Sequence, residues 1–259
     1  ENKTIPCQTG SPSSHKLQST TSSKQLQNQA FSDQLMMKFF AATFLSTLLL
    51  AEPAAATGTP KKKRNAEIEV VNLTYRQPFS PPFWMSHRCD MPKKLFKFGA
   101  RASNGLALLA ETGSGAGLME EFPSKGNKYV CATGQHDGPI RPSERDTIKV
   151  RMGRCDCVSM ASMLIHTNDA FVAINGMNID YLYEPEFLPA LDAGSETNDE
   201  LCKNMPGPAC ATIDERNGRN LTDVEGFVHV HRNMQDVGDL IDFGWLNPTA
   251  KVSGYAYEI

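Results

Sequence analysis

The sequence carries no excess of basic residues, no long hydrophobic span and none of the short motifs of common enzymes. Its 26 lysines and arginines stand against 29 aspartates and glutamates, a formal net charge of −3, so nothing predicts a surface for nucleic acid. The longest apolar run, Phe39 to Ala51, is shorter than the roughly 20 residues that cross a bilayer. C-x-x-C, G-x-S-x-G and G-K-[ST] motifs are absent, which argues against a thiolate zinc site, a serine hydrolase and a phosphate-binding loop.

The amino-terminal part differs in composition from the rest of the chain. Residues 1–35 are rich in Ser, Thr, Gln and Asn and cannot bury a core. A secretory signal peptide is predicted at 36–56, which has a basic start, a short apolar middle and a small-residue cleavage site at its end. We therefore predict a disordered or gene-model extension over 1–35, a basic linker over 57–66 and one domain over 67–259, with no transmembrane segment in the mature chain. A buried helix is the alternative for 36–56.

The number of cysteines also supports secretion into an oxidising compartment. Six of the seven cysteines fall in the predicted domain, an even number that suits an oxidising environment. Cys202 and Cys210 enclose a loop with two prolines and a glycine, whose reversal predicts a disulfide between them. The other four can pair in more than one way: Cys89, Cys131, Cys155 and Cys157.

N-x-S/T triplets provide candidate sites for glycosylation. They occur at Asn72 and Asn220 in the predicted domain and at Asn2 in the extension. A secreted protein would carry glycans at such asparagines where they lie on the surface. We therefore expect a glycoprotein with Asn72 and Asn220 as its candidate sites.

The domain sequence alternates short β-rich runs with loops of Gly, Pro, Asn and Asp. One helix is predicted over 102–111, ending at Gly113, and a second helical turn over 115–122. Strands are predicted at Glu67–Tyr75, Thr147–Met152, Cys157–Ile165, Ala170–Ile174, Val224–His231 and Ala250–Glu258. Many short strands with one or two short helices predict an all-β protein, an antiparallel β-sandwich.

Residues 168–201 collect hard oxygen ligands around a predicted reversal at Asn175-Gly176. Asn178 and Asp180 leave the same face if the segment is extended. Asp192 and Glu196 follow on either side of a glycine, in a stretch that must turn. Calcium prefers this set, because it takes about six to eight oxygen ligands. Three other acids nearby are expected to be surface charge: Asp169, Asp199 and Glu200.

The order of several short motifs resembles one known family. They are Phe79-Ser-Pro, Leu95-Phe-x-Phe-Gly-Ala100, Gly105-Leu-Ala, Leu109-Ala-Glu-x-Gly113, Ser162-Met-Leu, Thr167-Asn-Asp-Ala-Phe171, Asp192-Ala-Gly-Ser-Glu196 with Asn198 and Glu200, Glu225-Gly-Phe-x-His-x-His231, Gly238-Asp-Leu240 and Trp245-x-Asn-Pro248. Together they resemble the spondin domain, the amino-terminal module of F-spondin and the main module of mindin. The likeness runs from about Glu67 to Tyr257, nearly the whole predicted domain.

The resemblance implies an eight-stranded β-sandwich that binds one calcium ion and acts in contacts at the cell surface or extracellular matrix. Carried onto this sequence, the calcium ligands are Asn178, Asp192 and Glu196. Asn178 departs from the family, because it offers a neutral amide where the animal proteins have a carboxylate. Asp180 on the same face could replace the missing charge. The chain has no thrombospondin-type repeat after the domain, so it resembles the stand-alone secreted form.

His229 and His231 form an H-x-H pair on a predicted strand, which places both imidazoles on one side. They could bind zinc or copper as a second metal, with His166 as a third nitrogen. The alternative is that they are polar residues bonded to acids such as Glu225 or Asp239.

We therefore predict a secreted calcium-binding module for cell adhesion or recognition, without catalytic residues, whose partner is an extracellular protein or glycan. Its metal ligands are predicted to be Asp192 and Glu196 with Asn178 or Asp180. Two other functions stay open. One is a metal-dependent enzyme that uses His229 and His231, and the other is a purely structural sandwich.

Overall fold

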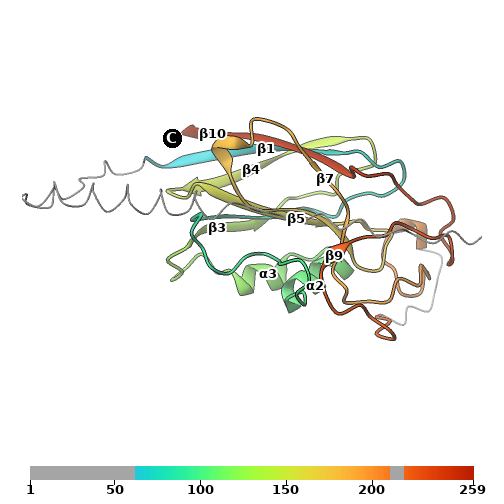
Figure 1. The fold of residues 1–259 in the computed structure, drawn as a ribbon. Coiled ribbons are helices and arrows are strands. Elements are labelled where there is room, and N and C mark those ends of the chain that lie inside the picture. The colour runs from blue at the N-terminus through green and yellow to red at the C-terminus, as the bar shows by residue number, and fades with distance from the viewer. Residues whose placement is uncertain (1–61, 211–218) are drawn as a thin grey trace, which may run out of the picture. The chain divides into compact units, whose positions relative to one another are not determined.

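Two antiparallel sheets form the domain (Figure 1), as described by a computed structural model for residues 62–210 and 219–259. The smaller sheet has the order β4 (Arg145–Gly153), β1 (Arg64–Asn72), β10 (Ala250–Glu258), β7 (Glu186–Leu188). The larger has the order β3 (Val130–Gln135), β2 (Phe83–His87), β5 (Cys157–Met163), β6 (Ala170–Asn178), β8 (Leu191–Asp192), β9 (His229–Val230). The predicted all-β sandwich is confirmed. These residues form ten strands where eight were expected, and β8 and β9 have two residues each.

The main core lies between the two sheets and follows from strand alternation. In β1, buried Ala66, Ile68 and Val70 alternate with more exposed residues. Successive side chains of a strand point to opposite faces, so these three face the other sheet. They belong to one buried cluster with residues from both sheets, among them Ile148, Val150, Val158, Met160, Val172, Ile174 and Val252.

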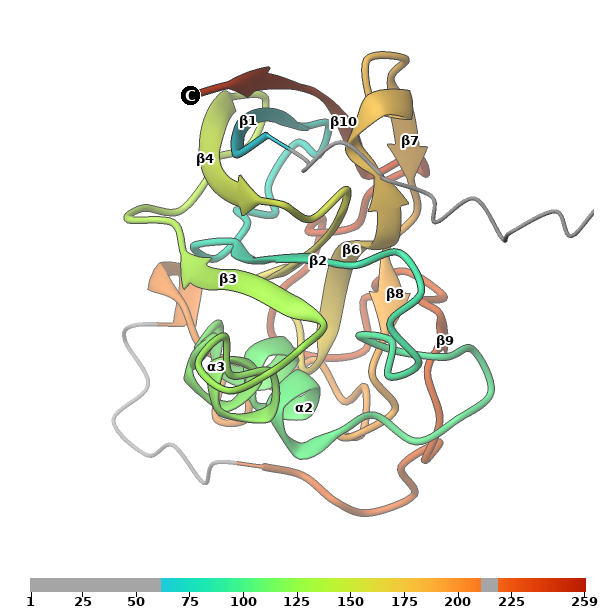
Figure 2. The same cartoon turned by 90° about the vertical axis from the view of Figure 1, so that its left-hand side faces the viewer.

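Two helices cover the outer face of the larger sheet, as Figures 1 and 2 show. They are α2 (Asn104–Thr112) and α3 (Ala116–Glu121). Leu106 and Leu109 of α2 share a second buried cluster with Phe171 of β6. Strand β5 is therefore buried along its whole length, because a sheet covers one face and helices cover the other. Both predicted helices are confirmed.

The amino and carboxyl ends of α2 use common capping residues. The Ser103 hydroxyl accepts a hydrogen bond from the Leu106 amide at 3.2 Å, and the helix ends at Gly113 with φ +73°. Glycine adopts this left-handed conformation at little steric cost. The helix end brings Glu111 toward the loops beside β8, where the candidate site lies.

The predicted reversal at Asn175-Gly176 is wrong, because β6 continues straight to Asn178. Gly176, with φ +75°, is an extra residue in the pairing with β5. Ser159 pairs with Asn175 and Val158 pairs with Met177, so Gly176 forms a β-bulge between them. The bulge uses the positive φ that the sequence indicates, but it does not turn the chain.

Three disulfides join the six cysteines of the domain. The predicted Cys202–Cys210 bond is confirmed, and the other two are Cys89–Cys157 and Cys131–Cys155. Disulfides of this kind persist in oxidising compartments. In the part of the chain that the structure covers, no helix is both long and apolar enough for a membrane crossing. The predicted extension and signal peptide lie outside the described residues.

Asn72, a predicted glycosylation site, is fully buried at the end of β1. Its Nδ2 donates to the carbonyls of Gln77 at 2.8 Å and Ile140 at 3.1 Å, and its Oδ1 accepts from Thr74. A glycan would be attached to that same Nδ2, so this folded structure is incompatible with glycosylation of Asn72. Asn220 is partly exposed, and its glycosylation stays a prediction.

Candidate metal centre

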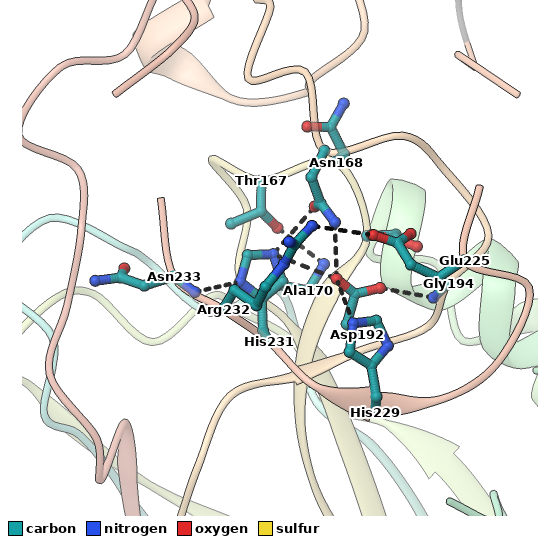
Figure 3. A network of polar contacts seen from close by, with 12 residues as sticks. Thr167, Asn168, Ala170, Asp192, Gly194, Glu225, His229, His231, Arg232 and Asn233 are labelled. Carbon is teal, nitrogen blue, oxygen red and sulfur yellow. Dashed lines mark hydrogen bonds and ion pairs between the residues drawn. The ribbon is translucent and has the colours of Figure 1, made fainter. Parts of the chain in front are cut away.

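A polar cluster lies at the end of the larger sheet where β6 begins and β8 ends (Figure 3). Ala170 pairs with Asp192, and Asp192 pairs with His229 of β9. The residue before β6, Asp169, therefore reaches the same corner as Asp192. Antiparallel pairing of short strands thus gathers side chains that are far apart in the sequence.

Asp169 organises the turn that contains Ser195 and Glu196. It is completely buried, and its Oδ2 accepts hydrogen bonds from the backbone amides of Ser195 at 2.7 Å and Glu196 at 3.0 Å. Its other oxygen, Oδ1, is buried and has no hydrogen-bond partner. The expectation that Asp169 is surface charge is wrong. Its position just before an apolar strand is the signal that could have revealed it.

Asp192 is buried at the centre of the cluster. Its Oδ1 accepts from the Gly194 amide at 2.7 Å, and its Oδ2 accepts from Asn198 Nδ2 at 2.8 Å. The Nε2 atoms of His229 and His231 lie 3.8 Å and 3.6 Å from the same Oδ2. Figure 3 shows Asp192 beside both rings. The predicted common side of the two imidazoles is confirmed.

Gly194 is required by the close approach of two loops. It has φ +62°, and a Cβ there would lie 2.5 Å from the carbonyl oxygen of Phe227. The amide of Gly226 donates back to the Gly194 carbonyl at 2.9 Å. The turn of Asp192 to Glu196 is therefore fixed against the loop that carries Glu225 and His229.

Glu196 is buried beside a second acid, Glu111 of α2. Arg219 donates to Glu111 Oε1 at 2.6 Å, and its Nε lies 3.7 Å from Glu196 Oε1. Glu196 Oε2 is buried and has no partner. These three residues border a pocket of about 750 Å³ whose other lining residues include Leu108, Lys203, Leu221 and Val224.

The charges of the cluster are not balanced. Burial, followed by the neighbouring charge of Asp192, raises the pKa of Asp169 to about 8. Burial, followed by the charges of Glu111 and Asp169, raises the pKa of Glu196 to about 8. Both shifts arise because a buried carboxylate near other carboxylates is unfavourable. A bound cation would offset both shifts, because it stabilises the charged form of each carboxylate.

Asp199 and Glu200 differ, because donors already satisfy them. Asp199 accepts from the side-chain amides of Asn168, Asn204 and Asn220 at 3.0, 2.6 and 2.7 Å. Glu200 accepts from the backbone amides of Gln235 and Val237. Glu200 is buried, so the expectation that it is surface charge is wrong. Both acids have structural partners and need no cation.

Glu225 and His229 form a second group around Asp192. Among the described residues, Asp192, Glu225 and His229 are the one set of three whose ligand atoms all lie within 4.8 Å of one another. Glu225 Oε2 is buried and unpartnered. His166 is elsewhere, with its Nε2 accepting from the Ala209 amide at 3.3 Å. It cannot be the third nitrogen of the predicted histidine site.

Asn178 and Asp180 do not belong to this cluster. Asn178 pairs with Cys157 at the far end of β6, and eight residues of strand separate it from Ala170, roughly 26 Å at about 3.3 Å per residue. Its Oδ1 accepts from the Asp180 amide at 2.9 Å, while Asp180 pairs with Arg64 at 2.7 Å. The prediction that they share a site with Asp192 and Glu196 is wrong.

No protein-family model matches the chain, and no curated protein matches it. Its function must therefore be inferred from the chemistry of the cluster. In the described residues, three buried side-chain oxygens or nitrogens lack a hydrogen-bond partner: Asp169 Oδ1, Glu196 Oε2 and Glu225 Oε2. All three are carboxylate oxygens from this one corner. Buried polar atoms are rarely left unpaired, so each of these calls for a partner such as an ion.

Proposed function

We propose that the chain is a secreted calcium-binding recognition module, in which the carboxylates of Asp169, Asp192 and Glu196 move together around one calcium ion. The observation that carries the proposal is the pair of buried, unpartnered oxygens, Asp169 Oδ1 and Glu196 Oε2. An unpaired buried carboxylate is costly, and a divalent cation offsets that cost with direct bonds. Asp169 takes the place that sequence reasoning gave to Asn178.

Calcium suits this group better than other divalent ions do. The donors are carboxylate oxygens, with backbone carbonyls and side-chain amides nearby, and calcium accepts such ligands in a flexible geometry. Magnesium demands a stricter octahedral arrangement and keeps several waters. The resemblance to the spondin domain supports the same ion. The disulfides and the predicted signal peptide support an extracellular location, where calcium is plentiful.

The ion would act by shaping a surface. It would join the residue before β6 to the turn of Asp192 to Glu196, and that turn borders the pocket beside Glu111 and Arg219. Leu221 and Val224 are exposed apolar residues that line this pocket. A pocket with a largely apolar lining and a few charged side chains fits an extracellular protein or glycan as partner. Binding, and not catalysis, is the proposed activity.

Calcium titration of the purified full-length chain by isothermal calorimetry tests the metal site. We expect about one ion per chain, and a large loss of affinity in Asp169→Asn and Glu196→Gln, since each removes one charged ligand. Glu184→Gln is the matched control, because it removes one exposed carboxylate away from the cluster. Equal calcium binding in all four proteins would contradict the proposed site.

Cell adhesion to surfaces coated with the chain tests the recognition role. We expect adhesion in calcium that falls in EDTA and in Asp169→Asn, with Glu184→Gln like the wild type. Calcium binding without any calcium-dependent adhesion would contradict the recognition role alone.

A further inference from the structure

We infer that the same corner contains a second metal site that takes zinc, with Asp192, Glu225 and His229 as its protein ligands and with Asp192 shared with the proposed calcium site. Their ligand atoms already lie within 4.8 Å of one another. Four-coordinate zinc with bonds of about 2.0–2.1 Å places neighbouring ligand atoms roughly 3.3 Å apart. His229 Nε2 and Asp192 Oδ2 are 3.8 Å apart, so this pair has to close by only about 0.5 Å.

His229 is held in the orientation that a metal ligand needs. Its Nδ1 lies 3.1 Å from the Phe227 carbonyl, to which it donates its proton. The neutral ring then has its lone pair on Nε2, the atom that faces Asp192. Metal-bound histidines usually have their second nitrogen hydrogen-bonded in this way, which fixes the tautomer and the ring. The side chain is 22% exposed, so an ion can reach it from solvent.

Glu225 supplies a free oxygen. Its Oε1 lies 3.6 Å from Arg232 Nη2 at the surface, whereas its Oε2 is buried without a partner. Figure 3 shows the Arg232 side chain extending past Asp192 to its ion pair with Glu225. The site therefore offers three ligands to an ion: the unpaired Glu225 oxygen, the lone pair of His229 Nε2 and the carboxylate of Asp192.

The backbone around these ligands is already in place. Between Glu225 and His229, the amide of Val228 donates to the Ala100 carbonyl at 2.8 Å. After His229, the amide of His231 donates to the Ala190 carbonyl at 3.0 Å. These hydrogen bonds fix the loop on both sides of the ligands, so binding an ion requires little ordering of the chain.

His231 does not act as a ligand, although it is the other half of the H-x-H pair. Its Nδ1 accepts from the Asn233 amide at 2.9 Å, so the proton of the neutral ring is on Nε2. That proton points to Asn198 Oδ1 at 3.1 Å, and Asn198 in turn donates to Asp192 Oδ2. His231 therefore positions Asp192 through Asn198.

The ligand set distinguishes this site from the calcium site. Calcium takes oxygen ligands, whereas an imidazole nitrogen with two carboxylates suits zinc. Three protein ligands leave the fourth tetrahedral position to water or to a group from a binding partner. Glu225 and His229 serve zinc alone, while Asp169 and Glu196 serve calcium alone.

Zinc titration of the untagged, EDTA-treated full-length chain in excess calcium tests the site. We expect one zinc per chain and an affinity at least about a hundredfold lower in His229→Gln and in Glu225→Gln, because loss of a ligand exceeds the usual effect of losing an orienting group. His136→Gln is the matched control, since His136 pairs with Asp146 elsewhere at 2.9 Å. Wild-type affinity in both His229→Gln and Glu225→Gln, or no stoichiometric zinc in the wild type, would overturn the inference.

Two further measurements separate the zinc site from the calcium site and the loss of a ligand from unfolding. Asp169→Asn should lose calcium and keep zinc, so failure of the calcium proposal leaves the zinc result readable. Cobalt substituted for zinc should give the strong visible absorption of a four-coordinate ion, which His229→Gln should abolish. Circular dichroism of each metal-free variant must match the wild type, so that a lost signal reports the ligand and not unfolding. A cobalt spectrum unchanged in a folded His229→Gln variant would also overturn the inference.

Discussion

One carboxylate oxygen of Asp169 accepts the backbone amide of Glu196 at 3.0 Å, while its other oxygen and Glu196 Oε2 are buried with no partner. The first contact forms the turn, and the other two oxygens leave that turn with two buried acceptors that no donor satisfies. The fold therefore leaves two buried carboxylate oxygens without hydrogen bonds at one end of the sandwich. Calcium at these oxygens would explain why the fold keeps them buried.

Calcium should raise the melting temperature of the wild-type chain. At a calcium concentration of 100 times Kd, linkage adds about 2.7 kcal/mol, which corresponds to roughly 5–10 °C for a domain of this size. Asp169→Asn should remove the shift, and Glu184→Gln should retain it. Differential scanning fluorimetry in calcium and in EDTA measures both. An equal shift in the wild type and Asp169→Asn would be incompatible with the site.

The pH dependence of stability should differ with and without calcium. The pKa values of Asp169 and Glu196 in the folded protein, about 8 each, lie above those of an unfolded chain. Between roughly pH 4 and 8 the folded state therefore binds more protons, so the contribution of these groups to stability is lost as pH rises. Calcium replaces the protons, so the gain from calcium should grow with pH.

Urea unfolding at several pH values, with calcium and with EDTA, measures this difference. Other titrating groups contribute to both curves and largely cancel in their difference. A calcium effect that stays constant from about pH 5.5 to 8.5 would show that these two carboxylates are not coupled to the ion.

Gly194→Ala should damage the cluster from a position that carries no ligand. A Cβ would collide with the Phe227 carbonyl, and φ +62° is strained for alanine. We expect a loss of about 2–3 kcal/mol in the free energy of unfolding and weaker binding of both metals. Gly138→Ala is the control, because nothing lies within 4 Å of its Cβ position. Equal free energies of unfolding for Gly194→Ala and Gly138→Ala in urea would contradict the close approach of Gly194 to the Phe227 carbonyl.

The two sequons should behave differently in protein secreted from eukaryotic cells. Asn72 Nδ2 is buried with two hydrogen bonds, whereas Asn220 is partly exposed. Mass spectrometry of the folded protein should find glycan at Asn220 and none at Asn72. Full glycosylation of Asn72 in folded protein would contradict the buried hydrogen bonds of its side chain at the end of β1. Absence of glycan at Asn220 would contradict the prediction for that residue alone.

Local sequence signals predicted much of the fold. The strand at 250–258, the helix that ends at Gly113 and the Cys202–Cys210 disulfide follow from alternation, a glycine stop and a loop that must reverse. β2 was missed because Pro81-Pro82 indicates a break, yet the strand begins at the next residue. The strand predicted at Val224–His231 is too long, because only His229–Val230 pair as β9. Short strands such as β7 and β8 exist only through their partners, so no local pattern marks them.

The candidate site was predicted only in part, for a similar reason. Asp192 and Glu196 were found because their turn is local. Asn178 was included because the family resemblance placed a ligand there, but β6 continues past Gly176 and ends with Asn178 far from Asp192. Asp169 was missed because its burial depends on the pairing of Ala170 with Asp192, which no local pattern reveals.

A crystal structure of the chain grown with calcium, with the ion located by anomalous scattering, tests the central claim most directly. We predict one calcium within about 2.3–2.6 Å of Asp169 Oδ1 and Glu196 Oε2. A map without an ion at this corner under saturating calcium, or calcium bound only elsewhere, would contradict it.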